Sequence, residues 1–161
     1  MYSGSVRNLI KAIVFDLGNT LVRENSPTIE KMPHAVNVLA ELRKKYKLAV
    51  ISNVLPTTSG DKIREILLGA GLLDYFDEVV VSSEVGFSKP AEQIFKITLE
   101  KLNVKPEEAV MVGNIVSTDI FGGNGIGMKT VLLQETREYQ RSSWEKPTHT
   151  IQSLEELLKL V

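Results

Sequence analysis

Four short polar segments of this sequence contain residue types that could act together in one reaction. They are centred on Asp16 in VFDLGNTLV, on Ser52-Asn53, on Lys89 in the turn SKP, and on the stretch from Gly113-Asn114 to Asp119. An aspartate directly after an apolar run is a candidate nucleophile, and a hydroxyl, a lysine and a second acid could join it. Whether they form one site depends on the elements that position them.

Short apolar runs alternate with amphipathic stretches along the chain. The runs, rich in Val, Ile and Leu, predict strands at Ile10–Phe15, Leu48–Ser52, Glu78–Ser82, Ala109–Val112 and Thr130–Leu133. The amphipathic stretches predict helices at Ile29–Tyr46, Gly60–Ala70, Ala91–Leu102, Asp119–Gly125 and Leu154–Leu160, the last with a capping-box spacing at Ser153 and Glu156. The strands are apolar on both faces, as in a parallel sheet covered by helices on each side. The pattern predicts an α/β fold, a three-layer α/β/α sandwich with a Rossmann-like parallel sheet.

In such a sheet, ligands bind at the carboxyl ends of the strands, where the order of connection reverses. The predicted strand ends and adjoining turns hold Asp16, Ser52-Asn53, Lys89 and Gly113-Asn114, with Asp119 shortly after. We therefore expect a nucleophilic acid, a hydroxyl, a lysine and a second acid to meet at one edge of the sheet.

The bulk composition is that of an ordinary globular protein. A chain of 161 residues with 43% hydrophobic residues can form one domain, residues 1–161, without a disulfide or structural metal. Because 19 basic residues balance 20 acidic ones, we expect neither nucleic acid nor a membrane as a partner. The absence of cysteine excludes thiolate zinc sites and cysteine nucleophiles. No apolar stretch approaches the ~20 residues that a bilayer requires and none resembles a signal peptide, so the expected location is the cytoplasm.

The four polar segments resemble, in order, the motifs of the haloacid dehalogenase superfamily of aspartate-nucleophile phosphatases. The matching stretches are DLGNTL (Asp16–Leu21), ISN (Ile51–Asn53), GFSKP (Gly86–Pro90) and VGNIVSTDIFGGNGIGM (Val112–Met128). A single match of this kind is weak. Four in order, each at a predicted strand end or in the turn before a helix, identify the chain as a member of this superfamily.

The resemblance implies a Mg²⁺-dependent phosphohydrolase that works through an aspartyl-phosphate intermediate. Asp16 would be the nucleophile, and Lys89 and Ser52 would complete the catalytic group. The phosphate would be bound by Ser52, Asn53, Lys89 and Thr20. The Mg²⁺ would be bound by Asp16, the carbonyl of Gly18, Asn114 and Asp119.

Two positions depart from the pattern of the superfamily. Its members normally carry a second aspartate two residues after the nucleophile, as general acid and base, where this chain has Gly18. Its fourth motif normally begins Gly-Asp, where this chain has Gly113-Asn114. Since general acid–base catalysis contributes roughly 10²–10⁴ in rate, the glycine should weaken turnover of poor leaving groups most. The neutral amide of Asn114 should weaken the binding of Mg²⁺.

The segments between the motifs are too short for a cap domain. Between Asp16 and Ser52 we expect a loop and one helix, and between Ser52 and Lys89 one helix and one strand. The chain therefore resembles capless members of the superfamily, with an open site. By analogy, its partner would be a phosphorylated small molecule or an exposed phosphate on a larger substrate, and a neighbouring subunit of a homo-oligomer could serve as the lid. The substrate itself is not encoded in these motifs.

Two other functions remain open alongside the phosphohydrolase. A degenerate member that binds a phosphorylated ligand or a protein partner, with little or no turnover, would explain both Gly18 and Asn114. A haloacid dehalogenase would use the same aspartate without a metal. The missing helical cap, and Gly18 where that branch of the superfamily carries tyrosine, count against the dehalogenase.

Each candidate residue also has a purely structural interpretation. Asp16 could begin a turn, Ser52 or Asp119 could cap the segment that follows, and Lys89 could be a solvated loop lysine. The glycines at 122 and 123 precede a predicted strand instead of following one, so they indicate close packing and not a phosphate-binding loop.

Overall fold

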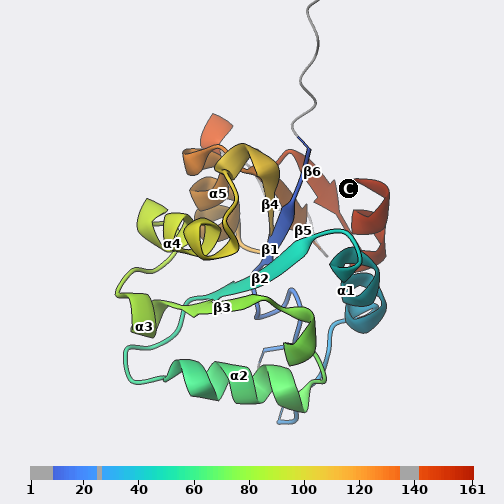
Figure 1. Cartoon of the computed structure of the whole chain (residues 1–161), viewed down its shortest axis with the longest axis vertical. Helices are drawn as coiled ribbons and strands as arrows, with labels where there is room; N and C mark the ends of the chain where they lie inside the picture. The colour runs from blue at the N-terminus through green and yellow to red at the C-terminus, as the bar shows by residue number, and fades with distance from the viewer. Residues whose placement is uncertain (1–8, 25–26, 135–141) are drawn as a thin grey trace, which may run out of the picture.

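A six-stranded parallel sheet runs through the molecule (Figure 1). The computed structural model describes residues 9–24, 27–134 and 142–161. Its strands are β1 (Ala12–Phe15), β2 (Lys47–Ser52), β3 (Glu78–Val81), β4 (Ala109–Gly113), β5 (Lys129–Leu133) and β6 (His149–Ile151), in the spatial order β3-β2-β1-β4-β5-β6. Every neighbouring pair is parallel. The predicted α/β fold with a Rossmann-like sheet is confirmed.

Helices cover both faces of the sheet, which gives three layers. On one face lie α1 (Ala35–Arg43), α2 (Gly60–Gly69) and a 3₁₀ helix at Leu154–Lys159, and on the other lie α4 (Glu92–Leu102) and α5 (Phe121–Ile126) (Figure 1). The short α3 (Ser82–Val85) follows β3 directly, and a π-helix at Val116–Ile120 precedes α5. Further 3₁₀ turns are at Leu73–Tyr75, Pro106–Glu108 and Ser143–Glu145. The segments between β1 and α1 and between β2 and β3 add no cap domain to this core.

The strand β1 shows why the apolar runs had to be apolar on both faces. Ile13 and Phe15 pack with α1 and α2, whereas Ala12 and Val14 pack with α4. Successive side chains of a strand point to opposite faces, so one strand contributes to both cores. Because burying a side chain such as Ile or Phe stabilises the fold by about 1.5–3 kcal/mol, this double burial fixes the register of β1.

The first helix is shorter than the sequence predicts. The expected span Ile29–Tyr46 shrinks to α1, because Pro33 cannot continue a hydrogen-bonded helix from the preceding residues and His34 adopts a left-handed φ of 67°. The six residues before α1 instead run beside the end of the Asp16 segment, where the N–H of Met32 donates to the carbonyl of Leu21 at 2.8 Å. The start of that prediction was therefore wrong.

The C-terminal part of the chain holds one strand that the sequence pattern does not reveal. β6 pairs in parallel with β5, but it is only three residues long and only Ile151 of it is buried. The expected final helix is present as a 3₁₀ helix, and the Glu156 carboxylate accepts the Ser153 N–H at 3.1 Å, as its capping-box spacing predicts. Gly122 and Gly123 are close-packed as expected, since a Cβ on Gly123 would lie 2.8 Å from the methyl carbon of Thr130.

The order of connection reverses at β1. From this central strand the chain first builds β2 and β3 on one side and then β4, β5 and β6 on the other. Phe15 pairs with Val112 of β4, and the N–H of Asp16 donates to the carbonyl of Val112 at 2.9 Å. The carboxyl ends of β1 and β4 are thus neighbours at the position where open α/β sheets bind ligands.

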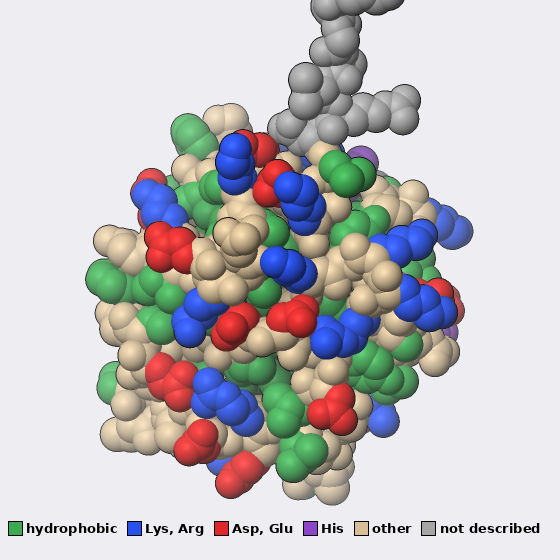
Figure 2. Space-filling model, viewed as in Figure 1, with side chains coloured by type: hydrophobic (Ala, Val, Ile, Leu, Met, Phe, Trp, Pro, Cys, Tyr) green, Lys and Arg blue, Asp and Glu red, His purple; other side chains and the backbone are tan. Residues whose placement is uncertain are grey.

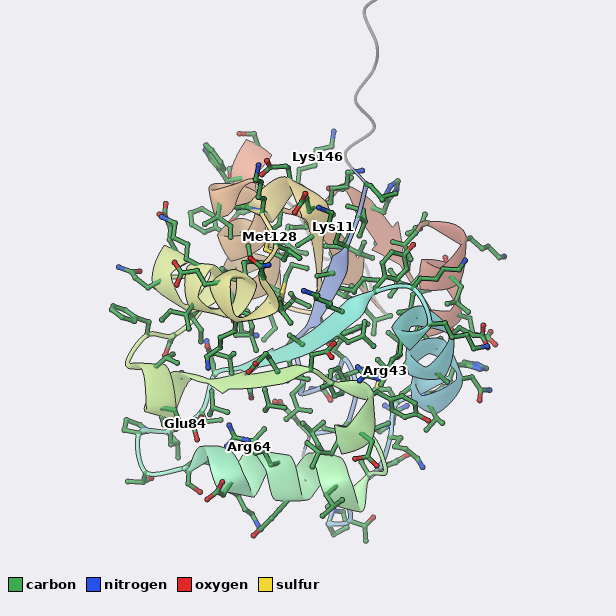
Figure 3. The ribbon with its side chains drawn as sticks, viewed as in Figure 1. Lys11, Arg43, Arg64, Glu84, Met128 and Lys146 are labelled. Carbon is green, nitrogen blue, oxygen red and sulfur yellow. The ribbon has the colours of Figure 1, made fainter. Side chains whose placement is uncertain are left out.

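The surface is mixed in charge, and one exposed ion pair joins two helices. On the face shown in Figure 2, Lys and Arg side chains are interspersed with Asp and Glu. Arg64 on α2 reaches Glu84 on α3 with two contacts, Nη1 to Oε1 at 3.0 Å and Nη2 to Oε2 at 3.2 Å (Figure 3). In the described part of the chain, no helix has the length and apolar character needed to cross a membrane.

Candidate active site

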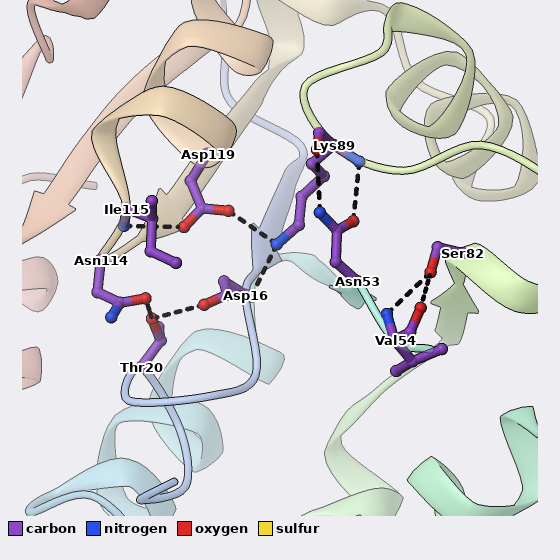
Figure 4. A network of polar contacts seen from close by, with 9 residues as sticks. All are labelled: Asp16, Thr20, Asn53, Val54, Ser82, Lys89, Asn114, Ile115 and Asp119. Carbon is purple, nitrogen blue, oxygen red and sulfur yellow. Dashed lines mark hydrogen bonds and ion pairs between the residues drawn. The ribbon is translucent and has the colours of Figure 1, made fainter. Parts of the chain in front are cut away.

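Three charged side chains meet at the carboxyl ends of β1 and β4. The Nζ of Lys89 lies 2.7 Å from Oδ1 of Asp16 and 2.7 Å from Oδ1 of Asp119 (Figure 4). All three are buried, with Asp119 at 0% and Lys89 at 4% exposure. Buried charges need partners of opposite sign, and here one ammonium serves two carboxylates. The solvated-loop interpretation of Lys89 is therefore wrong.

Asn53 fixes the backbone of Lys89. Its Nδ2 donates to the Lys89 carbonyl at 2.9 Å, and its Oδ1 accepts the Lys89 N–H at 2.8 Å (Figure 4). The amide oxygen is thus engaged with the lysine backbone, whereas the backbone N–H and the second N–H of the amide are the donors that Asn53 could offer a phosphate. Asn53, the residue after β2, thus positions a lysine that lies 36 positions later in the chain.

The π-helix positions Asp119. The N–H of Ile115 donates to Oδ2 of Asp119 at 3.1 Å, while Oδ1 accepts from Lys89. The carboxylate lies over Gly113, at whose Cα a Cβ would overlap the Asp119 side chain. Each oxygen of Asp119 therefore already accepts one hydrogen bond, and its predicted part in binding a metal relies on the remaining lone pairs. The interpretation of Asp119 as the N-cap of the helix that it opens is wrong, because Asp119 lies inside the π-helix, where its carboxylate accepts the N–H of Ile115.

The pKa values in this cluster follow from burial and from the shared ammonium. For Lys89, burial alone lowers the pKa, but the Asp119 and Asp16 carboxylates outweigh it and hold the pKa above its ordinary value. For Asp119, burial raises the pKa, and the opposing attraction of Lys89 does not cancel it. The two carboxylates thus keep the lysine in its charged form.

Three oxygen-bearing groups converge beside Asp16. In one orientation of the Asn114 amide, its Oδ1 accepts from the hydroxyl of Thr20 at 3.4 Å and faces Oδ2 of Asp16 and the Gly18 carbonyl. In the other, the amide nitrogen takes that place and donates to Asp16 at 2.9 Å and to Gly18 at 3.2 Å. Oxygens that face one another repel unless a cation or a hydrogen-bond donor lies between them, and the turned amide supplies such donors itself.

The spacing of these groups fits a small divalent cation. Neighbouring oxygens on an octahedral Mg²⁺ lie about 2.9 Å apart, because each ligand sits about 2.1 Å from the ion. The two separations at Asn114, 2.9 and 3.2 Å, are close to this value. Within residues 9–24, 27–134 and 142–161, no cluster holds three or more His, Cys, Asp and Glu side chains. A cation here would therefore depend on neutral oxygens as well as on carboxylates.

Sequence reasoning missed the carboxylate of Glu24. A Cβ on Gly18 would overlap the Glu24 carboxyl group, so this side chain occupies the space next to the glycine. Glu24 is held there by Asn19, whose Oδ1 accepts the Glu24 N–H at 3.0 Å and whose Nδ2 donates to Oε2 at 3.3 Å. In the sequence, Asn19 was the signal that could have indicated this contact, because asparagine tolerates a left-handed backbone. Asn19 has a φ of 55°, which folds the loop back toward Gly18.

A cavity of about 340 Å³ opens beside Ser52, Asn53 and Gly18. Ser52, whose hydroxyl is predicted to bind phosphate, is buried at the end of β2 and is one of the residues that line this cavity. Of the predicted site residues, the hydrogen-bonded cluster contains Asp16, Thr20, Asn53, Lys89, Asn114 and Asp119, with Gly18 at its edge. The expectation that these segments meet at one edge of the sheet is borne out by their contacts, while their roles stay predictions.

Comparisons with known proteins agree with this arrangement. The model of the haloacid dehalogenase-like hydrolases matches residues 28–127. A glyceraldehyde 3-phosphate phosphatase from Methanothermobacter thermautotrophicus is 39% identical over 120 residues, which cover 73% of this chain and 51% of the relative. A ribulose-1,5-bisphosphate 5-phosphatase from Halopiger xanaduensis is 35% identical over 138 residues, which cover 81% of this chain and 56% of the relative. The chain thus spans about half the length of these curated relatives.

Solved structures show the same architecture. A HAD phosphatase from Thermococcus onnurineus superposes with a TM-score of 0.77 at 25% identity, over 94% of this chain and 97% of that one. A 2-haloacid dehalogenase from Pseudomonas syringae has a TM-score of 0.81 at 17% identity, over 94% of this chain and 98% of that one. The second likeness concerns the fold alone, because at such identity the chemistry is not shared by necessity.

Proposed function

Because this chain belongs to the haloacid dehalogenase-like hydrolases, we propose that it is a Mg²⁺-dependent phosphohydrolase that acts through Asp16. The observation that carries this proposal is the ammonium of Lys89 at 2.7 Å from Asp16, at the point where the order of strands reverses. The matched relatives are named phosphatases of small phosphorylated compounds, which supports the same class of substrate.

The two carboxylate oxygens of Asp16 face different groups. Oδ1 accepts from Lys89, and Oδ2 faces Thr20 and Asn114. In the proposed reaction the carboxylate attacks phosphorus, an O–P bond forms, and the bond to the ester oxygen breaks. The departing alcohol takes up a proton, and water then hydrolyses the aspartyl-phosphate to regenerate Asp16 and release phosphate. Lys89 stabilises the charge on the transferring group, and Ser52 binds one of its oxygens.

The residues present are compatible with a bound Mg²⁺. Asp16, the Gly18 carbonyl, Asn114 and a remaining lone pair of Asp119 would hold it. When bound, the ion neutralises charge on the phosphoryl group and so lets an anionic nucleophile approach.

A second candidate is a member that binds a phosphorylated ligand or a protein partner without turnover. One observation favours it: the turned amide of Asn114 donates to both Asp16 and Gly18 and so removes the need for a cation. In this case the site would bind anions through Lys89 and Ser52 and show no response to Mg²⁺. The carbon–halogen hydrolase has no comparable support, because the named relatives are phosphatases.

Hydrolysis of 4-nitrophenyl phosphate, with and without Mg²⁺, separates these candidates. We expect Mg²⁺-dependent release of nitrophenol, since a good leaving group needs no proton from the enzyme. Asp16→Asn should lower the rate at least about 10³-fold, because an amide is not a nucleophile here. Asp61→Asn on the exposed start of α2 is the matched control and should keep full activity. Activity that survives Asp16→Asn, or that ignores Mg²⁺, would contradict the proposal.

The extent of the functional unit is also a proposal. All six described strands join one sheet, which supports a single domain over residues 1–161. A cytoplasmic location, the absence of nucleic acid and membrane partners, and assembly into a homo-oligomer stay predictions. Size-exclusion chromatography with light scattering would test the last of these directly.

A further inference from the structure

The cavity beside Ser52 is walled mainly by apolar side chains. Its walls come from the loop after β1, the loop after β2 and the helix α2, and include Leu17, Val22, Ile29, Val54, Ile63 and Ile66. A volume of about 340 Å³ is within the usual range of small-molecule sites. One end of the cavity thus meets the groups proposed to hold phosphate, while the rest can exclude water from an apolar group.

The walls of this cavity are fixed by contacts of their own. The Ser82 hydroxyl accepts the N–H of Val54 at 2.9 Å and donates to its carbonyl at 3.2 Å, which holds the Val54 wall (Figure 4). Ile29 lies against α2, where a Cβ on Gly69 would come within 2.9 Å of its Cδ1. A preformed apolar wall binds an apolar group without first having to order it.

The charged residues that line the cavity are already engaged. Among the described lining residues, Arg23 is the sole cation and Glu24 the sole carboxylate. Arg23 Nε lies 3.4 Å from the carboxylate of Glu30, and Glu24 is held by Asn19. A second phosphate or a carboxylate on the substrate would find one cation here, shared with Glu30, and would be repelled by Glu24, so these walls suit an uncharged group better.

We propose that this cavity binds the leaving group of the substrate and selects phosphate monoesters of uncharged, largely apolar alcohols or phenols. The inference rests on the proposed phosphohydrolase activity, and it goes further by assigning substrate choice to the core of this chain. The apolar group lies between α2 and the loop after β1, while its phosphate reaches Ser52 and Asp16. Because the segments between the motifs are too short for a cap domain, these walls alone would contact the leaving group, which a cap would otherwise help to bind.

A pair of alkyl phosphates with leaving groups of similar reactivity tests whether the cavity selects apolar leaving groups. Hexyl phosphate and glycerol 1-phosphate both release alcohols, but only the first has an apolar chain. We expect kcat/KM for hexyl phosphate to exceed that for glycerol 1-phosphate at least about tenfold. Ile66→Ala on the wall should raise KM for hexyl phosphate roughly fivefold and leave its kcat unchanged, because it removes binding common to ground and transition states.

Two further variants keep the test independent of folding defects. Ile29 is 51% exposed, so Ile29→Ala spares the core and should raise KM for hexyl phosphate in the same way. Leu68 lies on α2 but outside the cavity and is 63% exposed, so Leu68→Ala is the matched control and should change nothing. Acetyl phosphate, whose small leaving group barely enters the cavity, should be hydrolysed equally by all four proteins.

Direct binding of 2-naphthol, followed by its fluorescence, separates this inference from the proposed activity. One outcome is that acetyl phosphate is not hydrolysed, but 2-naphthol binds and Ile66→Ala weakens this binding roughly fivefold. The proposed phosphohydrolase activity would then be wrong, and the assignment of the cavity would stand. If acetyl phosphate is hydrolysed but the two alkyl phosphates react equally well, the assignment is overturned. Absence of 2-naphthol binding to the wild-type protein overturns it whatever the activity.

Discussion

Two sets of opposite charges in this molecule share the same chemistry but differ in their surroundings. At the carboxyl edge of the sheet, the side chains of Lys89 and Asp119 are 2% and 0% exposed. Between α2 and α3, those of Arg64 and Glu84 are 37% and 41% exposed. Burial raises the pKa of Asp119, whereas the hydrogen bond from Arg64 is the largest influence on Glu84 and lowers its pKa.

The difference shows what burial changes about an ion pair. Water stabilises the charges of Arg64 and Glu84 almost as well as their mutual contact does. The contact therefore contributes little to the free energy of folding and mainly orients α3 on α2. Lys89 and its two carboxylates cannot turn to water, and each depends on the others. Burying such a cluster costs stability through dehydration, and it holds the Asp16 carboxylate at the edge where sheets of this kind bind ligands.

The largest expected effect comes from removing the shared cation. Lys89→Met leaves Asp16 and Asp119 buried with no counter-charge, and we expect the free energy of unfolding to fall by about 3–5 kcal/mol. Urea denaturation measures this change. Lys96→Met, which removes an exposed partner of Glu92 on α4, is the control and should cost less than about 1 kcal/mol. A similar small loss for both lysines would show that burial does not distinguish the two kinds of pair.

The next effect comes from adding a carboxylate at Gly18. The backbone permits it, since Gly18 is not among the described glycines with positive φ, but an added side chain would overlap Glu24. If Gly18 is an empty general-acid position, Gly18→Asp combined with Glu24→Ala should raise turnover of alkyl phosphates up to about 10²-fold, with little gain for aryl phosphates. Gly18→Asp alone should gain much less. Equal gains in the single and double variants would show that Glu24 does not obstruct the position.

A smaller effect is expected at Asn114, where a charge is added beside the buried cluster. Asn114→Asp supplies an anionic oxygen where the neutral amide now faces Asp16, so half-saturation by Mg²⁺ should need roughly tenfold less ion, or about 1.4 kcal/mol. Activity or calorimetric heat against Mg²⁺ concentration gives the value. Asn103→Asp at the exposed end of α4 is the control. Unchanged half-saturation in Asn114→Asp would remove this residue from the metal site.

The smallest effect belongs to the exposed pair. Glu84→Gln should lower the free energy of unfolding at neutral pH by less than about 1 kcal/mol. A carboxyl whose pKa is lowered in the folded state stabilises the fold above its unfolded pKa and ceases to do so as the pH falls. The difference between wild type and Glu84→Gln should therefore begin to shrink as the pH falls below the ordinary Glu pKa of about 4.3, and should vanish at a pH below the lowered pKa of the folded state. A difference that persists there would contradict the electrostatic account.

Much of the fold and the meeting of the site residues was predictable from the sequence. In the runs that became β1 to β5, nearly every buried side chain is apolar, with Ser52 and Thr130 as polar exceptions, and only a parallel sheet between two helical layers buries both faces of such strands. Once that sheet was predicted, Asp16, Ser52 and Asn114 had to lie at the same edge, because the carboxyl ends of parallel strands share one edge. The short β6 escaped prediction because three residues with one buried side chain give no periodic signal.

The sequence by itself determined the sheet, the edge at which sheets of this kind bind ligands, and the residue types gathered there, since these follow from periodicity and strand polarity. Only the tertiary structure decided how the groups are used. It joined Lys89 to two carboxylates, gave the amide of Asn53 to the backbone of Lys89, and brought Glu24 over Gly18. It also left a walled cavity beside Ser52. These contacts join segments that lie far apart in the chain or that a left-handed residue folds back. The spacing of residue types along the sequence does not predict the distance or the direction between such segments in space.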